Sequence, residues 1–303
     1  MRLLLLLTCF VLTSCATSHH RVAPSPPTSS FFTTSDGKKL PLHHWNLQAQ
    51  PQLVLIGLHG IEGAGRDYRN LGHALAGDSP NTSLYALNLR GAGYDPDLND
   101  QGDIASPQLW VRDLQELNHS LHIRHPQARF LWIGESMGSL IALHALDSTD
   151  TPPDGLILVS PVISLKGIPA WQVGLLKGAA FVAPRARVSL QALAGGSFQA
   201  TTNSEHFQQS ATNSYHIDRY SLRYLRTLAQ LSTTMGKQAT KANRPVLILH
   251  GGKDPLTSAD QITEFANAFP QKPQVREFKD SHHLLFYDKN KKEVIASILD
   301  WTD

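Results

Sequence analysis

The chain has 303 residues, of which 41% are apolar and 17% are charged. This balance is typical of a globular protein with a sizeable core, and it excludes an intrinsically disordered chain. The 27 Lys and Arg residues against 25 Asp and Glu residues give a formal net charge of +2. So balanced a charge offers no electrostatic footprint for nucleic acid, and we expect no such partner.

Residues 1–14 are typical of a secretory signal peptide. Met1-Arg2 is a short positive start, and the apolar run 3–12 that follows is too short to span a bilayer, which needs about 20 residues. The segment ends in Leu12-Thr13-Ser14-Cys15, which resembles the lipobox of bacterial lipoproteins.

That resemblance implies cleavage before Cys15, lipidation of Cys15 and attachment to a membrane of the bacterial cell envelope. Ala16 after the cysteine favours the outer membrane, facing the periplasm. The alternative is an ordinary secretory signal that contains a cysteine by chance. Residues 15–30 are rich in Ser and Pro without apolar periodicity, so they are predicted to form a tether.

From residue 31 onward, strand-like and helix-like patterns alternate. Asp36-Gly37 between two extended runs predicts a hairpin. The later strand candidates are almost wholly apolar, as strands buried on both faces of a parallel sheet are. They are 53–58, 84–89, 130–133, 156–159, 246–249 and 275–278. The alternation predicts an α/β class with a mostly parallel, doubly wound sheet.

One interval, 162–243, shows no clear strand pair and is too long for a structureless loop. We therefore predict a helical cap inserted into a core of residues 31–161 and 244–303. The apolar stretch 171–182 within it either lines an acyl pocket, dips into lipid or simply packs on the sheet. These alternatives stay open at this point.

The sequence Gly134-Glu135-Ser136-Met137-Gly138 lies between a predicted strand and a predicted helix. A G-x-S-x-G in that setting is typical of a nucleophile elbow, in which glycines on either side let the backbone pass closely and leave the serine hydroxyl exposed. A plain Gly-Ser turn between strand and helix is the alternative.

A serine nucleophile needs a base, and in this fold class the order along the chain is serine, acid, histidine. Asp254 follows the strand candidate 246–249, and His282-His283 follow the last one. Carboxyl ends of parallel strands meet at one edge, so Ser136, Asp254 and one of the adjacent histidines, His282 or His283, are the predicted catalytic residues. A turn-forming role for Asp254 is the alternative.

An oxyanion hole requires two backbone N–H donors. We assign Met137, directly after the nucleophile, and Ile61, in the glycine-rich loop after 53–58. A nucleotide-binding glycine motif is excluded there, because Tyr68 stands where the third glycine belongs. No sequence motif calls for a metal or a cofactor, and we expect neither.

These motifs resemble the monoacylglycerol lipase and lysophospholipase-like α/β-hydrolases, grouped with serine aminopeptidases of the proline iminopeptidase type. The resemblance covers most of the chain beyond residue 30. It implies the α/β-hydrolase fold, and the spacing from His283 to Asp288 favours His283 over His282 as the base. The matching segments are Asp36-Gly37, His59-Gly60, Arg90-Gly91, the Ser136 elbow, 247–251 with Asp254, and His283-Leu284-Leu285.

Three positions depart from the family pattern. Glu135 stands where the family usually has His, Ser139 where a second Gly is common, and Asn88 where Asp usually precedes Arg-Gly. A Glu135 carboxylate beside the nucleophile is expected to disfavour anionic substrates.

The resulting hypothesis is a serine hydrolase that cleaves carboxylic esters through an acyl-enzyme, with monoacyl lipids as substrates and a membrane as its partner through the lipid anchor. An aminopeptidase is one alternative, although 162–243 holds only Glu205 and Asp218 to bind a substrate ammonium. An acyltransferase and a catalytically inactive, envelope-binding lipoprotein are the others. The sequence indicates no oligomeric state.

Overall fold

The computed structural model describes residues 30–163, 170–190, 199–204 and 215–302. The predicted signal peptide, Cys15 and the tether up to residue 29 lie outside the described residues, as do parts of the predicted cap.

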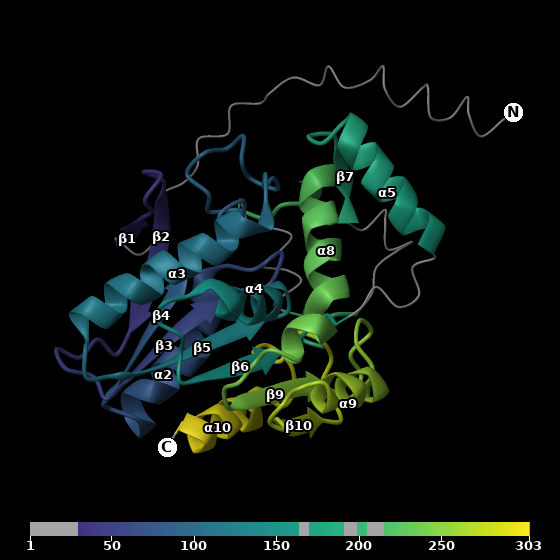
Figure 1. Cartoon of the computed structure of the whole chain (residues 1–303). Helices are drawn as coiled ribbons and strands as arrows, with labels where there is room; N and C mark the ends of the chain where they lie inside the picture. The colour runs from purple at the N-terminus through teal and green to yellow at the C-terminus, as the bar shows by residue number, and fades with distance from the viewer. Residues whose placement is uncertain (1–29, 164–169, 191–198, 205–214, 303) are drawn as a thin grey trace, which may run out of the picture.

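An eight-stranded sheet forms the centre of the fold (Figure 1). Its order is β1-β2-β4-β3-β5-β6-β9-β10. Strands β1 and β2 pair antiparallel, β2 pairs antiparallel with β4, and all later pairs are parallel. The bounds are β1 Phe31–Thr33, β2 Lys39–Trp45, β3 Leu53–Leu58, β4 Thr82–Leu87, β5 Arg129–Glu135, β6 Gly155–Val159, β9 Val246–Gly251 and β10 Gln274–Phe278. The predicted mostly parallel sheet is confirmed.

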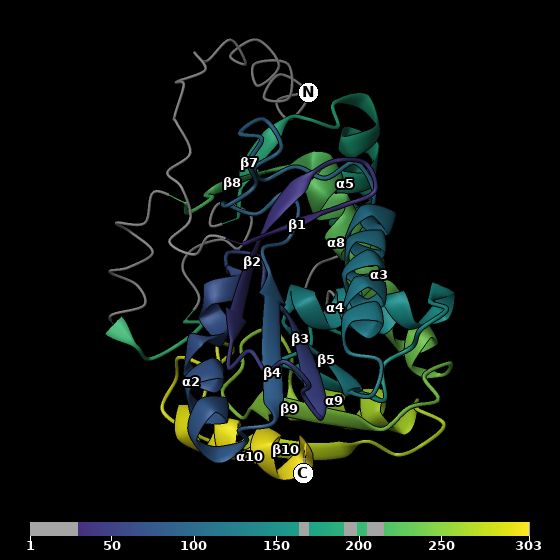
Figure 2. The ribbon, with the colours of Figure 1, turned by 90° about the vertical axis from the view of Figure 1, so that its left-hand side faces the viewer.

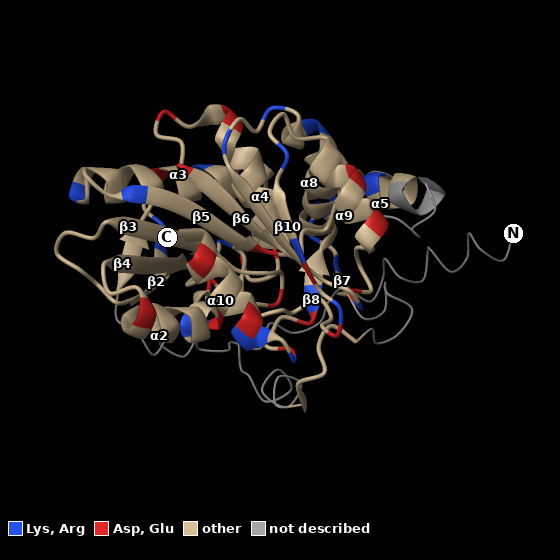
Figure 3. Cartoon of the chain, turned by 90° about the horizontal axis from the view of Figure 1, so that it is seen from below, with Lys and Arg blue, Asp and Glu red and all other residues tan. Residues whose placement is uncertain are grey.

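Helices cover both faces of the sheet, as Figure 2 shows. One apolar core lies under α2 (Arg69–Asp78) and α10 (Lys291–Thr302). The other lies under α3 (Pro107–Arg124), α4 (Met137–Ala145), α8 (Leu222–Ala239) and α9 (Ala259–Asn267). The central strands carry almost no charged residues, which lie on the helices and loops (Figure 3). The sheet is therefore buried on both sides, as apolar strands require.

Serine side chains start three of these helices. Ser106, Ser221 and Ser258 accept hydrogen bonds from N–H groups of the first turns of α3, α8 and α9. Each satisfies a backbone donor that has no partner inside the helix. Pro107 at the first position of α3 has no N–H to satisfy, which adds to the same effect.

The described part of the predicted cap contains α5 (Ala170–Val182), β7 (Arg187–Ser189), β8 (Arg219–Ser221) and α8. In Figure 1, α5 and β7 project beyond the sheet while α8 runs back onto α4. The antiparallel pair β7–β8 was not expected, because each strand has only three residues, too few for a periodic pattern to indicate a strand. The cap is thus mainly, but not wholly, helical in the described part.

An ion-pair network attaches the first hairpin to α3. Arg90 follows β4 and donates two hydrogen bonds to Asp113 on α3, at 2.8 and 2.9 Å, and two to Asp36 in the hairpin, both at 3.0 Å. The side chain of Asp113 is 1% exposed, so its charge depends on Arg90 for compensation.

Replacing Arg90 therefore tests this network. Arg90→Met is expected to lower the free energy of unfolding by about 3 kcal/mol, because Asp113 is left as a buried charge without its partner. Arg112→Met is the control: Arg112 pairs with the same Asp36, but its side chain is 39% exposed, and the expected loss is below about 1 kcal/mol. Urea denaturation measures the free energy of unfolding of both variants. Equal losses would contradict the conclusion that Asp113 depends on Arg90.

Candidate active site

Ser136 lies in the sharp turn between β5 and α4. Its backbone has φ 51° and ψ −112°, a left-handed conformation that is strained for a residue with a side chain. Two glycines make the turn possible. A Cβ on Gly138 would lie 2.0 Å from the carbonyl oxygen of Leu58, and one on Gly134 would lie 2.3 Å from the carbonyl carbon of Gly138. Only glycine lets α4 start so close to β3 and β5.

The structure brings the three predicted catalytic side chains together. The imidazole Nε2 of His283 lies 2.8 Å from the hydroxyl Oγ of Ser136, and its Nδ1 lies 2.8 Å from Oδ2 of Asp254. The other oxygen of Asp254 accepts a hydrogen bond from the Leu256 N–H at 2.8 Å, which holds the carboxylate in place. This arrangement can take a proton from the serine and stabilise the imidazolium that results.

His282, the neighbouring candidate, faces elsewhere. Its Nδ1 lies 3.1 Å from Oδ2 of Asp288, which also accepts the His282 N–H. Burial alone would raise the pKa of Asp288, but hydrogen bonds from Thr202 and from the His282 N–H lower it to about 2. Asp288 is therefore an anion that fixes the loop carrying His283.

The predicted oxyanion loop follows β3 and lies against the elbow. A Cβ on Gly60 would be 3.4 Å from the Cβ of Ser136, so the two backbones are neighbours. The Gly60 carbonyl accepts from Nδ1 of His59 at 2.7 Å and from the Gly63 N–H at 3.1 Å. The Gly60 carbonyl and the Ile61 N–H belong to the same trans peptide group, in which they point in opposite directions. Fixing the carbonyl therefore also fixes the Ile61 N–H, which faces away from the two donors.

His59 sets this geometry, a role that the sequence pattern did not assign. Its Nε2 accepts the Leu89 N–H at 2.9 Å, so its Nδ1 carries the proton that it donates to Gly60. Complete burial lowers the pKa of His59 and keeps the ring neutral, which is the form that one donor and one acceptor require. Neither the Ile61 nor the Met137 N–H donates to another described residue.

Asp67 and Tyr287 are further residues of the site that the sequence did not single out. Oδ2 of Asp67 accepts the Ala64 N–H of the oxyanion loop at 2.7 Å, and Oδ1 accepts the hydroxyl of Tyr287 from the His283 loop. Nothing in the local sequence marks them, because an Asp in a helical turn and a loop Tyr are both common surface residues.

Glu135 differs from its expected state. It is only 2% exposed, and burial, followed by the negative charge of Asp67, raises the pKa of its carboxyl to about 8. At neutral pH the group is therefore mostly uncharged, so the discrimination against anionic substrates expected from a Glu135 carboxylate is weak there. The sequence pattern could not indicate this, because the protonation state is set by burial.

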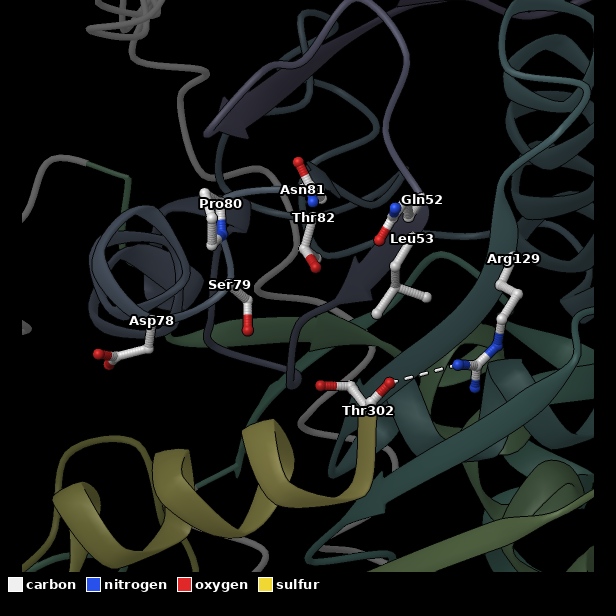
Figure 4. A pocket seen from close by; sticks show the side chains of 9 residues that line it. All are labelled: Gln52, Leu53, Asp78, Ser79, Pro80, Asn81, Thr82, Arg129 and Thr302. Atoms are coloured by element: carbon white, nitrogen blue, oxygen red, sulfur yellow. Dashed lines mark hydrogen bonds between the residues drawn. The ribbon is translucent and has the colours of Figure 1, made fainter.

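Within the described ranges, no three His, Cys, Asp or Glu side chains converge as metal ligands. No helix of the described part is long and apolar enough to cross a membrane. A pocket of about 360 Å³ lies at the opposite edge of the sheet, where β3, β4 and β5 begin (Figure 4). Arg129 lines it and donates to the Thr302 carbonyl at 3.4 Å.

Comparison with known sequences identifies a family and a partial relative. Residues 49–290 match the family described as serine aminopeptidase, S33. A stretch of 120 residues is 29% identical to the 3-hydroxybutyrate-oligomer hydrolase of Cupriavidus necator, and it spans 40% of this chain and 38% of that protein.

Comparison with solved structures gives close likenesses of fold. A soluble variant of the monoglyceride lipase of Saccharomyces cerevisiae has a TM-score of 0.77 and 19% identity, covering 95% of this chain and 98% of that one. The monoacylglycerol lipase of Paleococcus ferrophilus has a TM-score of 0.73 and 20% identity, over 86% and 97% of the chains. A thermostable carboxyl esterase of Bacillus coagulans has a TM-score of 0.77 and 15% identity, covering 90% of this chain and 96% of that one. The predicted α/β-hydrolase fold is confirmed.

The raised pKa of Glu135 predicts a pH-dependent stability. The ordinary pKa is 4.5, so between about pH 4.5 and 8 the unfolded chain releases this proton while the folded protein keeps it. The free energy of unfolding therefore falls as pH rises through this window, by linkage. Relative to wild type, Glu135→Gln is expected to gain stability steadily from acidic to mildly alkaline pH.

Urea denaturation at several pH values measures this difference. Glu264→Gln, at an exposed position on α9, is the control and should run parallel to wild type. A constant difference between Glu135→Gln and wild type across the window would show that Glu135 ionises normally.

Proposed function

Because the chain belongs to the serine aminopeptidase S33 family, we propose that it is a serine hydrolase that cleaves carboxylic esters of monoacyl lipids, such as monoacylglycerols or lysophospholipids. The observation that carries the proposal is the hydrogen-bonded series Asp254–His283–Ser136, with 2.8 Å at each step. The family resemblance predicted from the motifs is confirmed by the match over 49–290.

In the proposed mechanism, Ser136 Oγ attacks the acyl carbonyl while Nε2 of His283 takes its proton. Asp254 holds the ring by Nδ1 and stabilises its charged form. His283 then returns the proton to the leaving alcohol, leaving an acyl-enzyme. Water, activated by His283 in the same way, releases the fatty acid and restores the serine.

The negative charge that develops on the carbonyl oxygen needs donors fixed in advance. We assign the Met137 N–H, at the start of α4, and the Ile61 N–H, whose peptide is held by His59 and Gly63. Tyr220 of the cap donates its hydroxyl to the Ile61 carbonyl at 3.1 Å, which supports the loop from the other side. Fixed donors of this kind contribute about 3 kcal/mol each to transition-state stabilisation.

The surface of the cap supports a lipid substrate. Leu175 is 54% exposed on α5, and Phe181 and Val182 at its end are each 83% exposed. Lys177 and Arg185 flank them and are also exposed. An exposed apolar surface with basic neighbours suits contact with lipid, and a lipid anchor at Cys15, which we also propose, would keep the cap near a membrane.

Two alternatives use the same nucleophile. An aminopeptidase needs an acid for the substrate ammonium, and exposed Glu62, next to Ile61, is one that such a group could contact. An acyltransferase would pass the acyl group to an alcohol instead of water. The inactive-lipoprotein alternative is disfavoured by the aligned side chains of Ser136, His283 and Asp254.

Removing the nucleophile tests the reaction. Ser136→Ala is expected to lower kcat/KM for aryl esters by at least about a thousandfold, because no acyl-enzyme can form. Ser160→Ala is a matched control: this serine is also buried with positive φ, and its hydroxyl has no partner among the described residues. It should retain activity within about threefold. Full activity of Ser136→Ala would exclude the assigned nucleophile.

A substrate panel tests the substrate class. We expect kcat/KM for monoacylglycerols of medium or long chain to exceed that for aminoacyl anilides by at least about tenfold, since the cap presents an apolar surface. Glycerol and lipid alcohols as acceptors, followed by product analysis, separate hydrolysis from acyl transfer. A 3-hydroxybutyrate oligomer belongs in the panel. Its preferential cleavage would contradict the lipid substrate but support ester hydrolysis, and preferential cleavage of anilides would favour the aminopeptidase.

A further inference from the structure

Three segments that supply the proposed catalytic groups also each supply one residue to a cluster centred on the buried Glu135. The oxyanion loop leads into Asp67, the elbow contains Glu135, and the His283 loop contains Tyr287. Asp67 accepts from Ala64 and from Tyr287, so one carboxylate connects the loop of Ile61 with the loop of His283. We name these three residues the Glu135 cluster.

The side chain of Glu135 lies between these segments, and the described residues give it no side-chain hydrogen bond. It is 2% exposed, and its Oε1 has no partner among the residues that the structure describes. Three groups interact electrostatically with Glu135: Asp67 and Tyr68 in the turn before α2, and Tyr287 in the His283 loop. The positive charge of Arg66 acts on Tyr287. None of these places a cation close enough to compensate a charge on Glu135.

Glu135 is buried beside the half-buried Asp67, whose negative charge opposes a second one on Glu135. Asp67 accepts two hydrogen bonds, whereas Oε1 of Glu135 accepts none from the described residues. At neutral pH the carboxyl group of Glu135 is therefore protonated. A second negative charge there would repel Asp67 and would also lie one residue from Ser136, where the oxyanion of the proposed reaction develops.

We propose that Glu135 is a positioning residue: its carboxyl must remain protonated for Asp67 and Tyr287 to hold the oxyanion loop and the His283 loop against Ser136. The proposal rests on the proposed serine hydrolase function. Ionisation of Glu135 lowers the rate by disturbing both loops, although Glu135 touches no substrate.

The pH dependence of kcat/KM for an aryl ester tests this, because that ratio reports groups of the free enzyme. Burial raises the pKa of Glu135 to about 8, so the wild-type value is expected to fall about tenfold from about pH 7 to about pH 9. In Glu135→Gln, which cannot ionise, the ratio of activity at the higher pH to that at the lower one should rise about tenfold. Glu264→Gln, exposed on α9, should keep the wild-type ratio.

A second variant tests the coupling to Asp67. Asp67→Asn removes the charge that raises the pKa of Glu135, so the alkaline decline is expected to shift to lower pH. A role of Asp67 in packing alone would lower the rate without moving the decline. If Glu135→Gln does not fold, the shift of the alkaline decline of kcat/KM in Asp67→Asn tests the proposal by itself.

The outcomes are distinct. An unchanged pH ratio in Glu135→Gln, an equal change in Glu264→Gln or an unmoved decline in Asp67→Asn overturns the inference. Ser136→Ala in the same assay reports separately on the proposed function: activity there at the wild-type level rejects the nucleophile, whatever the pH ratios of the other variants.

Discussion

The close approach of α4 to β3 is the constraint on which the site depends. The start of α4 can pass the end of β3 only because Gly138 and Gly134 carry no side chains. This contact turns the backbone of Ser136 into its left-handed conformation and places it beside Gly60. Strand β3 pairs with β5 along the whole length of β3, so the sheet fixes the elbow and the oxyanion loop relative to each other. The strain at Ser136 is sustained by the packed strands around it.

The loop of His283 packs on the end of β9 and is also held by polar contacts from other parts of the molecule. Asp288 bonds to the His282 N–H within the loop and to Thr202 of the cap, and the Leu284 N–H donates to the Ala200 carbonyl at 2.9 Å. From the other side, Asp67 accepts from Tyr287. The position of the imidazole is therefore determined jointly by the core, the cap and the oxyanion loop.

Most of the fold could be predicted because the central strands are continuous apolar runs and the hairpin has an Asp-Gly turn. The predicted strand 53–58 coincides with β3, whereas 84–89 was placed two residues late, since Asn88 and Leu89 already bond to Pro41 and His59 outside the ladder. The grouping of Ser136, Asp254 and His283 followed from the shared edge of parallel strands. The contacts of Asp67 and Tyr287 and the protonation of Glu135 could not be predicted, because they depend on tertiary distances and burial that no local pattern encodes.

The Ala200 and Thr202 contacts have a consequence for engineering. Specificity in a protein built as core plus insertion is commonly altered by transplanting the insertion from a homologue. In this chain, such a graft would also remove two supports of the loop that carries His283, the proposed general base. A chimera that retains 199–204 keeps the imidazole anchored while the remainder of the insertion is exchanged, whereas one joined at 162 and 243 loses that anchorage along with the old specificity.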